Sequence, residues 1–234
     1  MIETPDMCLP YRKACIVKYL GVVPYEDALS QQETLRQLRA KGEIPDAVLL
    51  LQHPHVYTVG HFRGEEDIIV SPENVPVFHT NRGGSITYHG PGQLVGYPIL
   101  DLQANGLGVR RYIWKLEEVI IKLLAGFGID AQRNDTYPGG VWVGSQKICS
   151  IGINVSRHIT MHGFALNVNN DLKYFEYIKP CGMREASMTS MAALLGHPVP
   201  FGAMVHNWIQ LFSEIFELRR ETKAALPVEE AASV

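Results

Sequence analysis

Two residues in the second half of the chain carry groups that could act together in nucleophilic chemistry. Cys181 stands between Pro180 and Gly182, a setting typical of a tight turn, and this placement predicts an exposed sulfur. A nearby ammonium group, such as that of Lys147, would lower the pKa of the thiol and so increase the nucleophilic thiolate. An inert buried thiol and a solvent-facing lysine remain the alternatives, because spacing alone does not show that the two side chains meet.

Cys149 is a rival nucleophile. In an extended strand, alternate residues share a face, so Lys147, Cys149 and Ile151 are predicted to point one way and Ser150 and Gly152 the other. This geometry alone favours Cys149 as the partner of the lysine. The four cysteines of the chain show no CxxC spacing, and each is expected to be a free thiol.

A glycine-rich block in the first half of the chain has the composition of a binding loop. Paired glycines allow a ligand to approach the main chain closely, and the polar side chains around them could hold a carbonyl or an amide. No GK[ST] or GxGxxG pattern accompanies them, so nothing indicates a phosphate site, and an ordinary hairpin turn is the alternative. The candidate binding residues of this block are Arg82, Gly83, Gly84, Ser85, Ile86, Thr87, Tyr88 and His89.

The elements that must position these residues form an α+β pattern, because predicted strands cluster in the middle of the chain and helices flank them. Residues 1–220 are expected to form a single domain, with a flexible tail at 221–234, and the loop at 60–76 resembles a lid. Helices are predicted near 25–40, 109–127, 187–196 and 204–218. Strands are predicted near 14–20, 47–52, 56–59, 77–79, 86–89, 94–100, 141–143, 146–155 and 160–168.

Composition excludes several classes of protein. The chain has 234 residues, a formal net charge of -3 and no basic run interleaved with aromatics, which argues against a nucleic-acid partner. No apolar stretch approaches the roughly 20 residues of a membrane span. The first residues lack the features of a leader, so a cytoplasmic location is expected. His53, His55, His79 and His89 show no metal-ligand spacing, and no metal is predicted.

Four ordered motifs between about residues 45 and 200 resemble the lipoyl(octanoyl) transferase family. The family pattern RGG, two residues, T, aromatic, H, two residues, GQ stands here as Arg82 to Gln93, followed by Tyr97. The other three are the segments 147–152, 162–167 and 180–182, with the sequences KICSIG, HGFALN and PCG. The resemblance implies a biotin/lipoate protein ligase-like fold with a mixed, largely antiparallel sheet and flanking helices.

The resemblance also implies a reaction. Octanoyl-acyl carrier protein would donate a medium-chain acyl group, and Cys181 would carry it as a thioester to a lysine of a lipoyl domain, the first step of protein lipoylation. The acceptors would be the lipoyl domains of 2-oxoacid dehydrogenase complexes and the glycine cleavage H protein. Lys147 would lower the thiol pKa and shuttle protons. No cofactor is implied, because a thioester is already activated.

The family pattern places further residues at the acyl site and favours Cys181 over Cys149 as the nucleophile. Besides residues 82–89, the expected substrate-binding residues are Ser150, Ile151, Gly152, Gly163, Phe164 and Ala165. Their main-chain amides could stabilise a developing oxyanion. Two other functions stay open, namely an ATP-dependent lipoate or biotin-type protein ligase and a non-catalytic acyl-binding protein.

Overall fold

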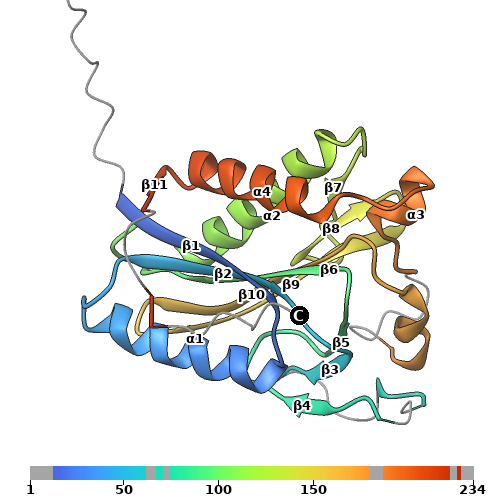
Figure 1. Cartoon of the computed structure of the whole chain (residues 1–234), viewed down its shortest axis with the longest axis horizontal. Helices are drawn as coiled ribbons and strands as arrows, with labels where there is room; N and C mark the ends of the chain where they lie inside the picture. The colour runs from blue at the N-terminus through green and yellow to red at the C-terminus, as the bar shows by residue number, and fades with distance from the viewer. Residues whose placement is uncertain (1–12, 62–66, 71–73, 180–186, 222–225, 228–234) are drawn as a thin grey trace, which may run out of the picture.

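A mixed sheet of eight strands forms the centre of the molecule in the computed structural model (Figure 1). The structure describes residues 13–61, 67–70, 74–179, 187–221 and 226–227. The strand order is β11-β1-β2-β6-β10-β9-β8-β7. In chain order, these strands are β1 (Lys13–Val22), β2 (Asp46–Gln52), β6 (Gln93–Ile99), β7 (Gln132–Arg133), β8 (Gly140–Val143), β9 (Gln146–Ser156), β10 (Ile159–Asn167) and β11 (Leu218–Arg220).

The large sheet is parallel at one edge and antiparallel elsewhere. Strand β1 runs parallel to both β11 and β2, and every pairing from β2 to β7 is antiparallel. The central strands β2, β6 and β10 are buried along almost their whole length because both faces of the sheet are covered. The predicted α+β class with a mixed, largely antiparallel sheet is confirmed.

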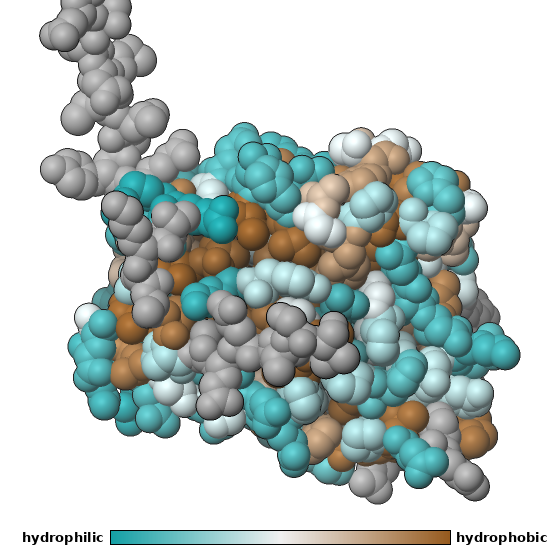
Figure 2. Space-filling model, in the orientation of Figure 1, coloured by the Kyte–Doolittle hydropathy of each residue, from teal (hydrophilic) through white to brown (hydrophobic). Residues whose placement is uncertain are grey.

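Helices cover the two faces of the sheet (Figure 1). Helices α2 (Val109–Ala125) and α4 (Phe201–Ile215) pack together on one face, where they enclose the larger core cluster. Helix α1 (Tyr25–Ala40) lies on the other face and buries Ala28 and Leu35 against the sheet. Figure 2 shows mainly hydrophilic side chains along the outer edge of α1 and apolar ones in the band between α4 and β1. The apolar faces of the helices thus define two layers of core.

A small second sheet extends the fold beside the glycine-rich block. Its strand order is β4 (Val77–His79), β3 (Val56–Val59) and β5 (Ile86–His89), with β3 between a parallel and an antiparallel neighbour. A 3-10 helix, η2 (Leu172–Tyr177), packs against this sheet through Phe175. The short helix α3 (Met191–Leu195) follows, with Ser190 capping its start.

The C-terminal part of the chain departs from the predicted pattern. The last helix ends at Ile215 rather than near 218, and Leu218–Arg220 adds a parallel strand to β1. A run of three residues is too short to show strand periodicity, so only its partner reveals it. Within the tail predicted at 221–234, Leu226 is buried near α1, while 222–225 and 228–234 lie outside the described residues. The single-domain boundary stays a prediction.

The loop predicted as a lid is described only in part, since residues 62–66 and 71–73 lie outside the described ranges. Its described residue Ile68 forms a bridge with Ile178. The lid role therefore stays a prediction. Among the helices of the described chain, none has both the length and the apolar character needed to traverse a bilayer.

Candidate functional site

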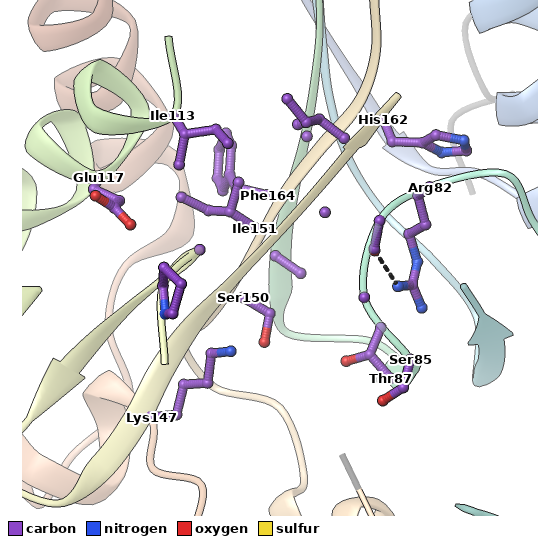
Figure 3. A pocket seen from close by; sticks show the side chains of 18 of the residues that line it. Arg82, Ser85, Thr87, Ile113, Glu117, Lys147, Ser150, Ile151, His162 and Phe164 are labelled. Carbon is purple, nitrogen blue, oxygen red and sulfur yellow. Dashed lines mark hydrogen bonds between the residues drawn. The ribbon is translucent and has the colours of Figure 1, made fainter. Parts of the chain in front are cut away.

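A cavity of about 860 Å³ opens between the glycine-rich block, strands β9 and β10, and helix α2 (Figure 3). Its walls combine apolar side chains with a few polar groups, the usual composition of a small-molecule site. Segments far apart in the sequence meet here because the sheet brings their strands side by side. The predicted residues that line it are Lys147, Arg82, Gly83, Gly84, Ser85, Ile86, Thr87, His89, Ser150, Ile151, Gly152, Gly163, Phe164 and Ala165.

Tyr88 is the one residue of the block 82–89 that does not line the cavity. Its ring stacks on Tyr174 at a centroid distance of 4.8 Å, and its hydroxyl lies 2.8 Å from Nδ1 of His55. Because alternate residues of β5 point to opposite faces, Thr87 faces the cavity and Tyr88 faces the small core under η2. The Tyr88 side chain therefore points away from the cavity, and the role of Tyr88 in substrate binding stays a prediction.

Arg82 shapes the wall of the cavity through bonds to the main chain. Its Nη2 donates to the carbonyl oxygen of Thr58 at 2.5 Å, and its Nη1 donates to that of Gly83 at 3.0 Å. Strand β9 can approach this wall only through Gly152, where a Cβ would lie 2.9 Å from the Gly83 carbonyl oxygen and 3.2 Å from Cδ of Arg82. The glycine-rich block thus lies close to a neighbouring strand at Gly152, and the close approach of a ligand stays a prediction.

Lys147 reaches the cavity because strand β9 carries a bulge. Consecutive residues of β8 pair with residues two apart on β9: Val141 with Cys149, and Trp142 with Lys147. Ile148 is therefore the extra residue. Since neighbours on β8 point to opposite faces, their partners on β9 do so too. The prediction that Lys147 and Cys149 share a face, which assumed unbroken alternation, is wrong.

Cys149 is enclosed in the core between the sheet and helices α2 and α4. Its side chain is fully buried, and burial raises the pKa of its thiol, which the nearby charge of Lys147 only partly opposes. A buried neutral thiol is a poor nucleophile. The structure thus removes the geometric argument that favoured Cys149. Cys181, the other candidate, lies outside the described residues.

Buried histidines form a polar network behind the glycine-rich wall. His53 bonds through its two ring nitrogens to the carbonyl oxygen of Val23 and the hydroxyl of Tyr97, each at 2.7 Å. His89 bonds to Oε1 of Gln93 at 2.9 Å. Burial lowers the pKa of His53 to about 4 and that of His89 well below its usual range, so both rings are neutral at pH 7. Each ring therefore acts as a neutral hydrogen-bonding group.

Comparison with known proteins gives this arrangement a family. A family model described as the Lipoyl protein ligase A/B catalytic domain matches residues 24–213. The chain belongs to the lipoyl protein ligase A/B family. Two relatives within it are named Octanoyltransferase. The one from Caldicellulosiruptor saccharolyticus is 49% identical over 86% of this chain and 88% of its own length, and that from Geobacter metallireducens is 46% identical over 80% and 86%. The predicted resemblance is confirmed.

Solved structures place the chain in the same lipoyl protein ligase A/B fold. A putative lipoate protein ligase from T. acidophilum superposes with a TM-score of 0.68 at 15% identity, covering 89% of this chain and 87% of that one. Lipoate-protein ligase A bound with ATP gives 0.65 at 15% identity, covering 91% and 90%. A biotin protein ligase from Aquifex aeolicus gives 0.52 at 13% identity, covering 88% and 69%. The predicted biotin/lipoate protein ligase-like fold is confirmed.

Helix α2 contributes cavity residues that were not predicted from the sequence. Ile113, Trp114 and Glu117 line the cavity from this helix. The sequence held one signal for them: Glu117 lies four residues after Ile113 and three before Ile120, so a charged residue interrupts the apolar stripe. Glu117 is only 6% exposed, which is unusual for glutamate.

Proposed function

We propose that this chain transfers an octanoyl group from a thioester donor to a lysine of a lipoyl domain, the first step of protein lipoylation. The observation that carries the proposal is Lys147, a lysine only 4% exposed whose side chain faces an 860 Å³ cavity with apolar walls. The shared name of the relatives supports octanoyl transfer and confirms the predicted acyltransferase class.

The proposed chemistry has two half-reactions through Cys181. In the first, the Cys181 thiolate attacks the carbonyl carbon of the donor thioester, a new C–S bond forms and the old one breaks. The donor sulfur leaves as a thiol with a proton from the Lys147 ammonium. In the second, the acceptor amine attacks the Cys181 thioester, an amide forms, and the amine proton passes back to Lys147. Cys181 is released as the thiolate, so every proton is accounted for.

The described chain that follows Cys181 supports a partnership with Lys147. The N–H of Lys147 donates to the carbonyl oxygen of Ser187 at 3.0 Å, and the N–H of Thr189 donates to that of Lys147 at 3.0 Å. Cys181 is six residues from Ser187, a length of chain that spans at most roughly 20 Å. The chain is therefore short enough to be consistent with the proposed contact between the two side chains.

The cavity walls suit the two ends of an acyl thioester. Ile113, Ile151 and Phe164 belong to one apolar cluster and lie together on one side of the cavity, in a position to cover an alkyl chain (Figure 3). The polar groups that would meet the carbonyl, Ser150 and Thr87, lie on the side of Lys147 (Figure 3). Main-chain amides of residues 82–89, 150–152 and 163–165 are proposed donors to the oxyanion.

The partners follow from the same reaction. A lipoyl-domain acceptor is supported by the relatives' name and the lipoyl protein ligase family. In our proposal, octanoyl-acyl carrier protein is the donor, the acceptors are the lipoyl domains of 2-oxoacid dehydrogenase complexes and the glycine cleavage H protein, and the enzyme acts in the cytoplasm without a cofactor.

Intact-protein mass spectrometry tests the transferase proposal. The enzyme is incubated with octanoyl-acyl carrier protein, and its mass is measured before and after an apo lipoyl domain is added. We expect a gain of one octanoyl group on the enzyme that is labile to hydroxylamine and passes to the lipoyl domain. Cys181→Ser should abolish labile acylation and transfer, whereas Cys149→Ser should retain both.

The rival functions give different results in the same assay. An ATP-dependent ligase would modify the lipoyl domain from free octanoate or lipoate only when ATP is present, and Cys181→Ala would still be active. A non-catalytic acyl-binding protein would never modify the lipoyl domain. Labile acylation that persists in Cys181→Ser would overturn the assignment of the nucleophile.

A further inference from the structure

The side chain of Lys147 lies between two residues of the neighbouring strand β8. Its Nζ atom is 5.7 Å from the centroid of the Trp142 ring, a distance at which a cation–π interaction is favourable. A Cβ at Gly140 would overlap Cε of Lys147 and lie 3.1 Å from Nζ. Gly140 therefore leaves the space that the lysine occupies, and Trp142 supplies the surface that its charge contacts. We call Gly140 and Trp142 the lysine cradle.

The lysine cradle surrounds the Lys147 side chain with an aromatic ring and a glycine, and it provides no anionic partner for the ammonium group. Trp142 is 2% exposed, and its Nε1 atom has no hydrogen-bond partner within the described chain. The outer side of the Trp142 ring is near Tyr137, whose ring stacks with it at a centroid distance of 5.8 Å. No carboxylate in the described ranges lies within salt-bridge distance of the lysine nitrogen. The position of the Lys147 side chain therefore depends on the position of strand β8.

Glu117 ties the first residue of β8 to helix α2. Its Oε1 atom accepts a hydrogen bond from the N–H of Gly140 at 3.3 Å, and its Oε2 atom accepts one from Nε of Arg133 at 3.1 Å. Glu117 also lines the cavity. One carboxylate thus joins the helix that forms one wall of the cavity to the strand that confines Lys147.

Placing a carboxylate here costs stability. Burial raises the pKa of Glu117, an effect that the bonds from Gly140 and Arg133 only partly offset. An apolar residue at this position would continue the stripe of α2 without that cost. One oxygen of this buried carboxylate accepts a hydrogen bond from a single main-chain N–H. The bond is better explained by its effect on the position of Gly140 than by a gain in stability.

We propose that Glu117 is a positioning residue for Lys147, acting through Gly140 and the lysine cradle. It holds the start of β8 in place, and the strand in turn holds the lysine side chain against the cavity. The importance of this for catalysis rests on the proposed function, in which Lys147 moves protons. The positional relationship between Glu117 and Lys147 does not rest on it.

Kinetics with a matched control test the catalytic consequence. Glu118 is the next residue of α2 and binds the same arginine, Arg133, at 2.7 Å, but it makes no contact with Gly140 and does not line the cavity. We expect Glu117→Ala to lower kcat for octanoyl transfer at least tenfold with KM changed less than twofold. Glu117→Gln keeps an acceptor oxygen and should stay within threefold of wild type, as should Glu118→Ala.

A labelling experiment tests the position of Lys147 without relying on octanoyl transfer. The folded proteins are treated briefly with acetic anhydride, and acetylation of Lys147 is measured by mass spectrometry relative to the exposed Lys122. Release of the lysine from the cradle should raise its relative rate at least fivefold in Glu117→Ala. The rate should stay within twofold of wild type in Glu117→Gln and Glu118→Ala.

The two measurements separate the ways in which the inference can fail. An unchanged Lys147 labelling rate in folded Glu117→Ala overturns it, and so does an equal rise in Glu118→Ala, which would trace the effect to Arg133. If wild type lacks octanoyl transfer, the proposed function fails while the labelling still decides the inference. If Glu117→Ala does not fold, Glu117→Gln and Gly140→Ala are compared, and wild-type labelling in Gly140→Ala contradicts the cradle.

Discussion

The main chains of Lys147 and Ser187 are joined by a hydrogen bond of 3.0 Å from the lysine N–H to the serine carbonyl oxygen. This bond links strand β9 to the segment that leads from the PCG motif into helix α3. The N–H of Thr189 donates to the carbonyl oxygen of Lys147. The lysine is therefore held through both its N–H and its carbonyl group. The described residues that begin at Ser187 are therefore fixed to strand β9 beside Lys147, which lines the cavity.

Removal of the Lys147 ammonium should abolish most of the turnover. Lys147→Met keeps an unbranched side chain against Gly140 and Trp142 but cannot transfer a proton, and general acid–base catalysis typically contributes about 10² to 10⁴ in rate. We expect octanoyl transfer to the lipoyl domain to fall roughly a hundredfold or more. Steady-state kinetics would measure the fall, with circular dichroism to verify folding, and a variant with more than a tenth of wild-type activity would exclude a proton-transfer role.

Cys149 should be dispensable for catalysis and inert to thiol reagents. Its sulfur is fully buried and its thiol pKa is raised, so the thiolate is scarce at pH 8. Cys149→Ala should retain at least a third of the activity and lose about 1 kcal/mol of unfolding free energy through the small cavity left in the core. Peptide mapping after brief iodoacetamide treatment of native protein should find Cys149 unmodified. Rapid alkylation, with activity lost in parallel, would restore it as a candidate nucleophile.

Gly152→Ala should impair activity more than stability. The added Cβ would lie 2.9 Å from the carbonyl oxygen of Gly83, so the glycine-rich wall must move away from β9. We expect about a tenfold loss of octanoyl transfer with the protein still folded. Gly202→Ala on α4 is the matched control, because nothing lies within 4 Å of its added Cβ and alanine favours a helix. Equal activity in the two variants would show that the wall tolerates the shift.

Buried histidines should make the protein less stable as the pH falls below about 6.5. The pKa of His53 is about 4 in the fold, so between these values the unfolded chain binds more protons and unfolding is favoured. At pH 5 this histidine alone should cost about 2 kcal/mol of unfolding free energy, and His162, with a pKa also about 4, should act in the same direction. The raised pKa of Glu117 opposes this trend.

Urea denaturation at pH 7 and pH 5 measures this dependence, and NMR titration of the imidazole signals assigns it. His197, which is exposed, serves as the internal reference in the NMR experiment. Equal unfolding free energies at the two pH values, together with a His53 signal that titrates near 6.5, would contradict the buried neutral state.

The sequence by itself determined the family, the class of fold and half of the residues that line the cavity. Motifs such as Arg82 to His89 carry this information because glycines permit turns and close approaches that other residues disfavour, and such local preferences depend on neighbouring residues. The helix at 109–125 could be predicted for a similar reason, because an apolar stripe with helical period repeats over several turns.

Only the tertiary structure decided which way the critical side chains point. The bulge at Ile148 turns Lys147 to the cavity and Cys149 into the core, and a bulge arises from pairing with another strand. The contact of Glu117 with Gly140 joins positions 23 residues apart, and that of Tyr88 with Tyr174 joins positions 86 apart. Such contacts depend on how helices and sheets pack, and the local sequence does not record that packing.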